Sequence, residues 1–327
     1  MLPQMNKSSY DNWFLKINDP TSQRALWLRF SALVSSNGFR RVADNLAIYS
    51  QRTAQDEVKK TALKQSYDLS ASERSDPEPS IRTGDCSLTP VSSHGTITSK
   101  GSTISWDLTF APSRQVGFEP IPERFQKIGL IRNSFRTPFE DVAVSGRTTL
   151  NGETFHWKDA PGMLGHRSGV RNPYSWTWGH CNTFKDEQGN YSDFIFEGLS
   201  ARFKLGPFVT PPASAFFFSY RGTEYVFNSL RRLLQIKSNH SLNEWTFEAG
   251  KDDLSFRGYL KAEHKDFAGL SFEDTNGSLL YSSNSLLSNM RILVYRSGKL
   301  EATLQSQGSA AFEIASRERN PYVPLIF

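Results

Sequence analysis

The side chains best suited to chemistry lie in one short stretch, YSWTWGHCNTF, at residues 174–184. Successive side chains of a β-strand point to opposite faces, so alternate residues belong together. One face would carry only small groups, which let another layer of protein approach closely. The other would carry large rings, an imidazole and an amide, namely Tyr174, Trp176, Trp178, His180, Asn182 and Phe184. This crowded face could line a cavity, or it could be clamped by a second domain.

Groups that could move a proton lie in and around this stretch. The imidazoles are His166, in GHRSG, and His180. A carboxyl that is buried among apolar groups can stay protonated near neutral pH and act as an acid. The acids with apolar sequence neighbours are Asp107, Asp193, Glu197 and Asp274. We select Glu197, in SDFIFEGL, although it could equally be a structural side chain.

Each of these residues also has a structural explanation. A strand tryptophan packs in a core more often than it contacts a ligand, because burial of its ring needs only one partner for its N–H. His180 could be a hydrogen-bonded packing residue. His166 and Arg167 could shape the turn in which they lie.

The elements that position these residues are predicted to be strands. Apolar residues alternate cleanly in 26–34, 102–110 and 198–205, which is typical of antiparallel sheets with two different faces. Asn-Gly pairs at 151–152 and 276–277 indicate hairpins. Helical patterns are scarce. The best are 226–236 and 55–65, and the latter could equally be a loop and a strand that ends at Tyr67.

Roughly eight strands are expected on each side of residue 170. Two such sets predict two antiparallel barrels or two sandwiches, and a length of 327 residues also favours two domains. We therefore expect one domain at 1–170 and another at 171–327.

Composition excludes several classes of function. The net charge is +5 without a clustered Lys/Arg run, so no nucleic-acid partner is expected. The start of the chain lacks the apolar region of a secretion signal, and no run of 18 apolar residues occurs, so a cytoplasmic protein is expected. Two cysteines cannot form a disulfide framework. Phosphate-loop, dinucleotide-binding and zinc motifs are absent from the sequence, so no cofactor and no metal is expected.

One longer segment, VSGRTTLNGETFHWKDAPGMLGHRSGVRNPYSWTWGHCNTF at 144–184, combines two hairpin strands, a Gly-His-Arg-x-Gly turn and the aromatic strand. It resembles the tandem lipocalin-like superfamily of tocopherol cyclase, carotenoid 1,2-hydratase (hydroxyneurosporene synthase) and AttH-type proteins. YDNWFLKIND, RALWLRF and GSTISWDLTF resemble earlier parts of that superfamily, so the similarity covers most of the chain. It implies an all-β fold of two lipocalin-like antiparallel β-barrels in tandem, with few short helices.

The resemblance also implies a function: protonation of a carbon–carbon double bond in an apolar isoprenoid or lipid-like molecule, followed by ring closure or water addition. His166, His180 and Glu197 would then be catalytic. Aromatic faces would stabilise positive charge by about 0.5–2 kcal/mol each, and Asn182 would orient a water or hydroxyl. The expected ligand-binding residues are Arg167, Tyr174, Trp176, Trp178 and Asn182.

Two other functions fit the same architecture. The protein could be a non-catalytic carrier of a hydrophobic ligand, or an interaction protein with two filled barrels. Contact with a membrane surface is compatible with a lipid-like ligand, and the sequence does not fix an oligomeric state. Function depends on the site rather than on the fold. A buried carboxylate that points into an apolar cavity would favour the enzyme, a cavity without an ionisable group would favour the carrier, and the lack of a cavity large enough for a ligand would exclude both.

Overall fold

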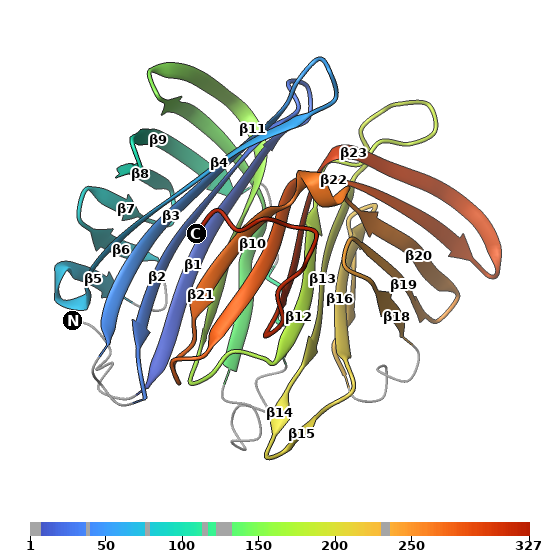
Figure 1. Cartoon of the computed structure of the whole chain (residues 1–327). Helices are drawn as coiled ribbons and strands as arrows, with labels where there is room; N and C mark the ends of the chain where they lie inside the picture. The colour runs from blue at the N-terminus through green and yellow to red at the C-terminus, as the bar shows by residue number, and fades with distance from the viewer. Residues whose placement is uncertain (1–7, 37–39, 76–78, 113–116, 122–132, 230–235) are drawn as a thin grey trace.

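The computed structural model describes residues 8–36, 40–75, 79–112, 117–121, 133–229 and 236–327 (Figure 1). These residues form two large antiparallel sheets that stand side by side, and two single-turn 3₁₀ helices, η1 (Leu69–Ala71) and η2 (His264–Asp266). The predicted all-β fold of two tandem antiparallel barrels with few short helices is confirmed. In the described ranges, no helix is long and apolar enough to span a membrane.

The first sheet has 11 strands in the order β4-β3-β2-β1-β11-β10-β9-β8-β7-β6-β5. It curls so that β4 packs across from β8, and its inner face encloses an apolar core that includes Trp13, Leu28, Trp106 and Leu164. Its strands are β1 (Ser9–Asp19), β2 (Arg24–Val34), β3 (Arg41–Arg52), β4 (Val58–Asp68), β5 (Ser72–Ser75), β6 (Ser80–Thr83), β7 (Cys86–Leu88), β8 (Ser92–Ser99), β9 (Ser102–Pro112), β10 (Asn133–Leu150) and β11 (Glu153–Gly169).

The second sheet runs β17-β16-β13-β12-β23-β22-β20-β19-β18, with β21 paired to β22. Aromatic rings fill its inner face: Phe218 stacks on Phe256 at 4.3 Å between centroids, and Phe196 stacks on Phe247 at 4.9 Å. Its strands are β12 (Ser175–Cys181), β13 (Phe194–Arg202), β16 (Ala213–Tyr220), β17 (Thr223–Phe227), β18 (Lys237–His240), β19 (Glu244–Lys251), β20 (Leu254–Lys261), β21 (Ala268–Glu273), β22 (Leu279–Arg296) and β23 (Lys299–Ser316). A small hairpin, β14 (Lys204–Leu205) and β15 (Phe208–Val209), follows β13.

In segment 55–65, the alternative of a loop followed by a strand is confirmed, and the helix is not formed. Residues from Val58 onward form β4, paired with β3 in an unbroken register from Val42↔Asp68 to Arg52↔Val58. Cross-strand pairing therefore outweighs the helical spacing of this segment. In the other segment with a helical pattern, 226–236, strand β17 ends at Phe227, and residues 230–235 lie outside the described ranges.

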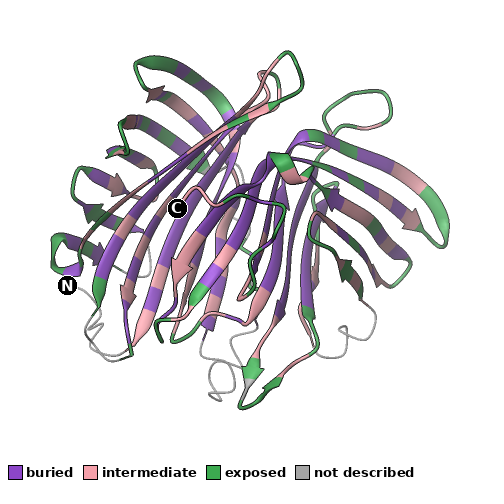
Figure 2. Ribbon diagram, in the orientation of Figure 1, coloured by how far each residue is buried: buried purple, intermediate pink, exposed green. Residues whose placement is uncertain are grey.

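A layer of side chains joins the two sheets, and we call it the seam. Along β1, Trp13 and Leu15 point into the first barrel whereas Phe14 points into the seam. From the other side, Trp176 and Trp178 of β12 pack into the same layer. The strands on both sides are buried along most of their length (Figure 2). The crowded face of β12 is thus clamped by the first sheet.

The small face of β12 points into the second barrel. A Cβ atom on Gly179 would collide with Leu260 and would also meet Phe196. Cys181, on the same face, belongs to the aromatic core. Small side chains at these positions leave room for the rings that fill the barrel, as expected of a face on which another layer packs closely.

Candidate functional site

Four ionisable side chains meet inside the seam, and we call them the seam cluster: Lys16, Glu140, His180 and Glu197. Each is at most 1% exposed. Lys16 and Glu140 come from β1 and β10 of the first sheet, and His180 and Glu197 come from β12 and β13 of the second. Because charged groups are rarely buried without a structural or functional reason, this cluster is the leading candidate site.

Irregular pairing in β10 places Glu140 in the seam. The pairing of β10 with β11 shifts its register between Arg136 and Phe139, and again between Phe139 and Val142. Val142 and Phe139 pack on the core of the first barrel, yet Glu140 and Thr137 meet β12 and β13. In a regular strand, residues 137 and 140 would point to opposite faces. Irregularities of this kind re-aim side chains.

Hydrogen bonds define the state of His180. Its Nε2 lies 3.0 Å from the backbone oxygen of Glu140, which can only accept, so Nε2 carries the proton. Its Nδ1 therefore accepts a hydrogen bond from Lys16 Nζ at 3.0 Å. Burial, and then the charge of Lys16, hold the pKa of His180 well below its ordinary value. Burial also lowers the pKa of Lys16 to about 8. At neutral pH the proton of this pair resides on Lys16.

The two carboxyl groups of the cluster have contrasting surroundings. Oε1 of Glu197 accepts hydrogen bonds from Trp178 Nε1 at 2.7 Å and Thr137 Oγ1 at 3.0 Å. Oε2 of Glu197 and both carboxyl oxygens of Glu140 accept no hydrogen bond from any other described residue, but the two carboxyl groups lie within hydrogen-bonding reach of each other. His180 Nε2 lies 3.6 Å from Oε2 of Glu140.

Both carboxyl groups favour the protonated form. Burial is the largest cause that raises the pKa of Glu140 well above its ordinary value, and the negative charge of Glu197 adds to it. Burial also raises the pKa of Glu197. Since Lys16 supplies one positive charge, the pair is best balanced with one proton shared between two carboxyls. A buried carboxylic acid of this kind can act as a general acid.

His166 lies elsewhere, in a polar group inside the first barrel that we call the barrel network. It pairs in register with Trp13, and their rings stack at 4.3 Å. Its Nδ1 accepts from Arg136 Nε at 3.1 Å, so its Nε2 donates to Asp11 Oδ2 at 2.7 Å. Asp11 also pairs with Arg74 at 2.9 Å. Burial opposes ionisation of Asp11, but the hydrogen bond from His166 and the charge of Arg74 hold its pKa below the ordinary value.

The structure brings three predicted site residues together, His180, Glu197 and Trp178. Asn182 lies beside them, donating to Asp141 Oδ1 at 2.7 Å and to the Gly162 oxygen at 3.0 Å. Tyr174 comes just before β12, where its backbone N–H bonds the Arg202 oxygen at 2.7 Å.

Two further predicted residues form another contact in the seam. Arg167 lies over the ring of Trp176 at 4.4 Å. Trp176 Nε1 donates to Glu313 Oε2 at 2.9 Å, so the two strand tryptophans each bond a different buried glutamate.

Sequence patterns missed Lys16 and Glu140. The even positions of β1 carry Asn12, Phe14 and Lys16, a mixed face that gives a weak sign of a buried polar site. Glu140 has no such sign, because the register shift that re-aims it is not visible in the residue order. Within the described ranges, no group of three or more His, Cys, Asp or Glu side chains is arranged to hold a metal.

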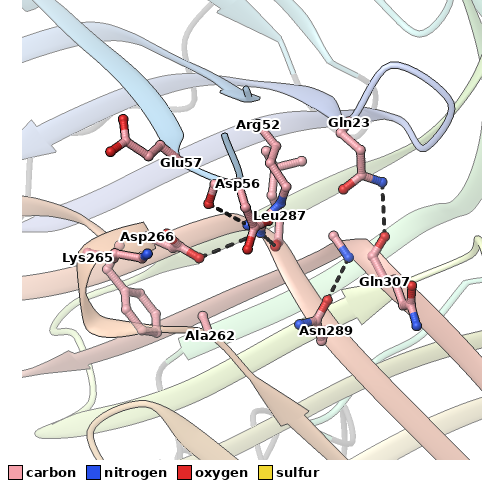
Figure 3. Close-up of polar contacts among 12 residues, drawn as sticks. Gln23, Arg52, Asp56, Glu57, Ala262, Lys265, Asp266, Leu287, Asn289 and Gln307 are labelled. Carbon is pink, nitrogen blue, oxygen red and sulfur yellow. Dashed lines mark hydrogen bonds and ion pairs between the residues drawn. The ribbon is translucent and has the colours of Figure 1, made fainter. Parts of the chain in front are cut away.

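A polar hollow of about 440 Å³ lies at another part of the seam (Figure 3). Arg52 of β3 reaches into it, pairing with Asp56 at 2.9 Å and lying 3.6 Å from Asp266. It also donates to the Leu287 oxygen at 3.3 Å, and Gln23 donates to the Gln307 oxygen at 3.1 Å. The contacts of Arg52 and Gln23 with the second sheet hold the two sheets together. We call this group of contacts the Arg52 joint.

Comparison with known proteins identifies the architecture. No family model matches the sequence, and no curated protein matches it. A candidate AttH protein from Nitrosomonas europaea superposes with a TM-score of 0.51 at 11% identity, over 97% of this chain and 96% of that one. Kievitone hydratase from Nectria haematococca superposes with a TM-score of 0.53 at 9% identity, over 96% of this chain and 90% of that one. At such identities the likeness concerns the fold, and at that level it confirms the resemblance seen in the sequence: this chain has the two-sheet architecture of the AttH protein and kievitone hydratase.

Proposed function

We propose that the protein binds an apolar isoprenoid or lipid-like molecule and transfers a proton to one of its carbon atoms, with the Glu140–Glu197 pair as the proton donor. The observation that carries this proposal is the pairing of two fully buried carboxyl groups, both with raised pKa, of which Glu140 accepts no hydrogen bond from any described residue other than Glu197. A structural ion pair would use its oxygens in hydrogen bonds. A protonated buried pair in which Glu140 has no other donor suits transfer to a substrate.

The chemistry follows from the neighbours of the pair. The protonated carboxyl gives its proton to one carbon of a double bond, which leaves a cation on the other carbon and a carboxylate on the protein. Lys16 stabilises that carboxylate, and His180 holds Lys16 in place through their 3.0 Å hydrogen bond. The Trp178 ring can stabilise the cation. Addition of water, or loss of a proton to the carboxylate, then completes the reaction and restores the acid.

The fold comparison supports this class of reaction in general terms. One protein of the same architecture is a hydratase by name. The seam cluster lies between two sheets packed with apolar and aromatic side chains, and such a surround excludes water from charged intermediates. Which molecule is bound is left to the experiment.

The test is isotope incorporation. Lipid extract from the host is incubated in D₂O with the protein, and deuterium gained at carbon is measured by mass spectrometry. Removal of a general acid lowers rates by about 10²–10⁴-fold, so Glu197→Gln and Glu140→Gln should each lose at least about 100-fold of the incorporation. Glu313→Gln is the matched control, because Glu313 is a buried glutamate bonded to the other strand tryptophan, Trp176.

Three outcomes separate the hypotheses. Incorporation that is lost in both cluster variants and kept in Glu313→Gln supports the enzyme. A lipid that co-purifies with the protein, without any incorporation above a protein-free control, indicates the carrier instead. Equal loss in all three variants would overturn the assignment of the acid to the seam cluster.

A further inference from the structure

A second polar site lies on the seam, in a small recess of about 50 Å³. One side of it is lined by β1, β2, β3, β4 and β11 of the first sheet, and the other by β12, β21 and β22 of the second sheet. The charged side chains that line it are four cations and two carboxylates, namely Arg29, Arg40, Lys64, Arg167, Asp44 and Glu273. The recess therefore has an excess of two positive charges.

Of these four cations, Arg40 alone forms an ion pair with a described carboxylate. Arg40 pairs with Glu273, and Lys64 lies over the Phe327 ring at 4.9 Å. By contrast, neither Arg29 nor Arg167 forms an ion pair with a described carboxylate. Their guanidinium groups lie over aromatic rings instead: Arg29 over Phe272 at 4.1 Å, and Arg167 over Trp176 at 4.4 Å.

The hydrogen-bonding edges of this site are left free. Arg29 donates one bond, from Nη2 to Asn12 Oδ1 at 3.3 Å, while its buried Nε has no partner in the part of the chain that the structure describes. The same holds for the hydroxyl of Tyr10, a residue 3% exposed that also lines the recess. Burial raises the pKa of Tyr10 to about 12, so this hydroxyl keeps its proton and can donate.

The positive charges of Arg29 and Arg167 repel each other. Burial, followed by the charge of Arg167, lowers the pKa of Arg29 to about 10. Glu313 and Asp44 act in the opposite direction, but Glu313 already accepts bonds from Trp176 and Ser282. An added anion would relieve the repulsion between the arginines.

We propose that this recess binds the oxyanion group of a small molecule, a carboxylate or a phosphate, through Arg29, Arg167 and the Tyr10 hydroxyl. Arginines whose faces are stacked on aromatic rings present their N–H edges to such groups, often two at a time. The recess holds the anionic group and not a whole ligand, since a volume of about 50 Å³ has room for only a few water molecules at roughly 10–15 Å³ each.

This site is distinct from the seam cluster. Asn12 of β1 lines the recess and Lys16 belongs to the cluster, and four residues of strand span about 13 Å. Phe14 stands between them, edge-on to Trp27 at 5.9 Å and to Trp178 at 5.7 Å. The proposal therefore does not depend on the proton chemistry described above.

The Arg52 joint shows what an internally satisfied arginine looks like in the same seam. Arg52 has Asp56 and Asp266 as partners and a backbone oxygen as a third acceptor (Figure 3). Arg29 and Arg167 have none of these. The difference indicates that the recess, unlike the joint, is built for an acceptor supplied from outside.

The experiment is calorimetric titration of the full chain with sodium phosphate and, separately, with sodium hexanoate, at a constant ionic strength set by chloride. We expect saturable binding of at least one of the two, and the pair of ligands separates phosphate from carboxylate recognition. Tyr10→Phe should weaken Kd about tenfold, as expected for one lost hydrogen bond to a charged group. Arg29→Met and Arg167→Met should each weaken it at least as much.

Arg257→Met is the matched control, because Arg257 also lies over a ring, Tyr295 at 4.8 Å, but is ion-paired to Glu248 at 3.2 Å. It should leave Kd unchanged. Tyr10→Phe keeps the ring and tests the proposal even where an arginine variant folds poorly. The proposal is overturned by the absence of saturable binding of both anions, or by binding that Tyr10→Phe and the arginine variants leave unchanged.

Discussion

The two buried histidines of this chain, His180 and His166, have opposite surroundings. His180 accepts a hydrogen bond from a cation, Lys16, and lies beside two carboxyls whose pKa values are raised. His166 donates to a carboxylate, Asp11, whose pKa is lowered and whose second partner is Arg74. The barrel network is thus an ion-paired group around an ionised carboxylate, whereas the seam cluster keeps an exchangeable proton on its two carboxyls.

This contrast decides which histidine belongs with the proposed chemistry. A satisfied ion pair gains its stability from the charges it holds, and a proton transferred there would break it. A cluster with raised carboxyl pKa values can give a proton and recover it. Four measurements test this distinction between the seam cluster and the barrel network.

The largest effect is expected from Lys16→Met, which removes the only cation of the seam cluster. Loss of one partner from a buried charged group costs about 3–5 kcal/mol, and we expect about 3 kcal/mol at pH 7 in urea unfolding. Because both carboxyls can then take up protons, the loss should shrink at pH 5. The exposed Lys299→Met is the control. A loss below about 1 kcal/mol would mean that the cluster does not need its cation.

Asp11→Asn should cause the next largest loss of unfolding free energy. It leaves Arg74 and His166 without their carboxylate, and hydrogen bonds to charged groups contribute about 1.5–3 kcal/mol. Urea unfolding should show that loss, with Asp107→Asn, at an exposed position, as the control. Deuterium incorporation in the folded variant should stay within about threefold of the wild type. A loss of incorporation as large as that in Glu197→Gln would join the barrel network to the chemistry.

The two sites should also respond oppositely to pH. Glu140 has a folded-state pKa raised above 4.5, so its contribution to stability is complete below 4.5 and is lost as pH rises through the folded pKa. Asp11 has a lowered pKa, so its contribution is present above 3.8 and is lost as pH falls through the folded pKa. Each proton changes stability by at most about 1.4 kcal/mol per pH unit.

Unfolding free energies of wild type and Glu140→Gln, measured between pH 4.5 and 7, isolate the pH-dependent contribution of Glu140 to stability. His180, whose pKa is lowered, contributes in the opposite sense in both proteins, so it cancels in the difference. The wild type should lose stability relative to Glu140→Gln as pH rises. A difference that is constant over this range would show that Glu140 is not held protonated.

The smallest effects are expected from the strand tryptophans. Trp178→Phe and Trp176→Phe each remove one hydrogen bond to a buried glutamate, which costs about 1 kcal/mol. Their stabilities should be alike, but deuterium incorporation should fall about fivefold only in Trp178→Phe, since a lost hydrogen bond of about 1 kcal/mol changes a rate about fivefold. Equal incorporation in both variants would separate Trp178 from the acid it contacts.

Much of the fold follows from the sequence because period-2 alternation is a local property. The crowded face of 174–184 sorts Trp176, Trp178 and His180 together without any knowledge of their partners, and the face of Glu197 in β13 meets it. Segment 55–65 shows the limit of such patterns, since its helical spacing gives way to pairing with β3. Intrinsic preference is weaker than a full ladder of strand hydrogen bonds.

The sequence by itself determined that this chain forms antiparallel sheets and that β12 has one crowded face, because side-chain direction in a strand depends only on neighbouring residues. The tertiary structure decided what that face meets. Lys16 and Glu140 lie 40 to 164 residues away from His180 along the chain, and Glu140 reaches the seam only through a register shift in β10. The state of each proton in the cluster depends on those distant charges and on burial between two sheets, and residue order records neither.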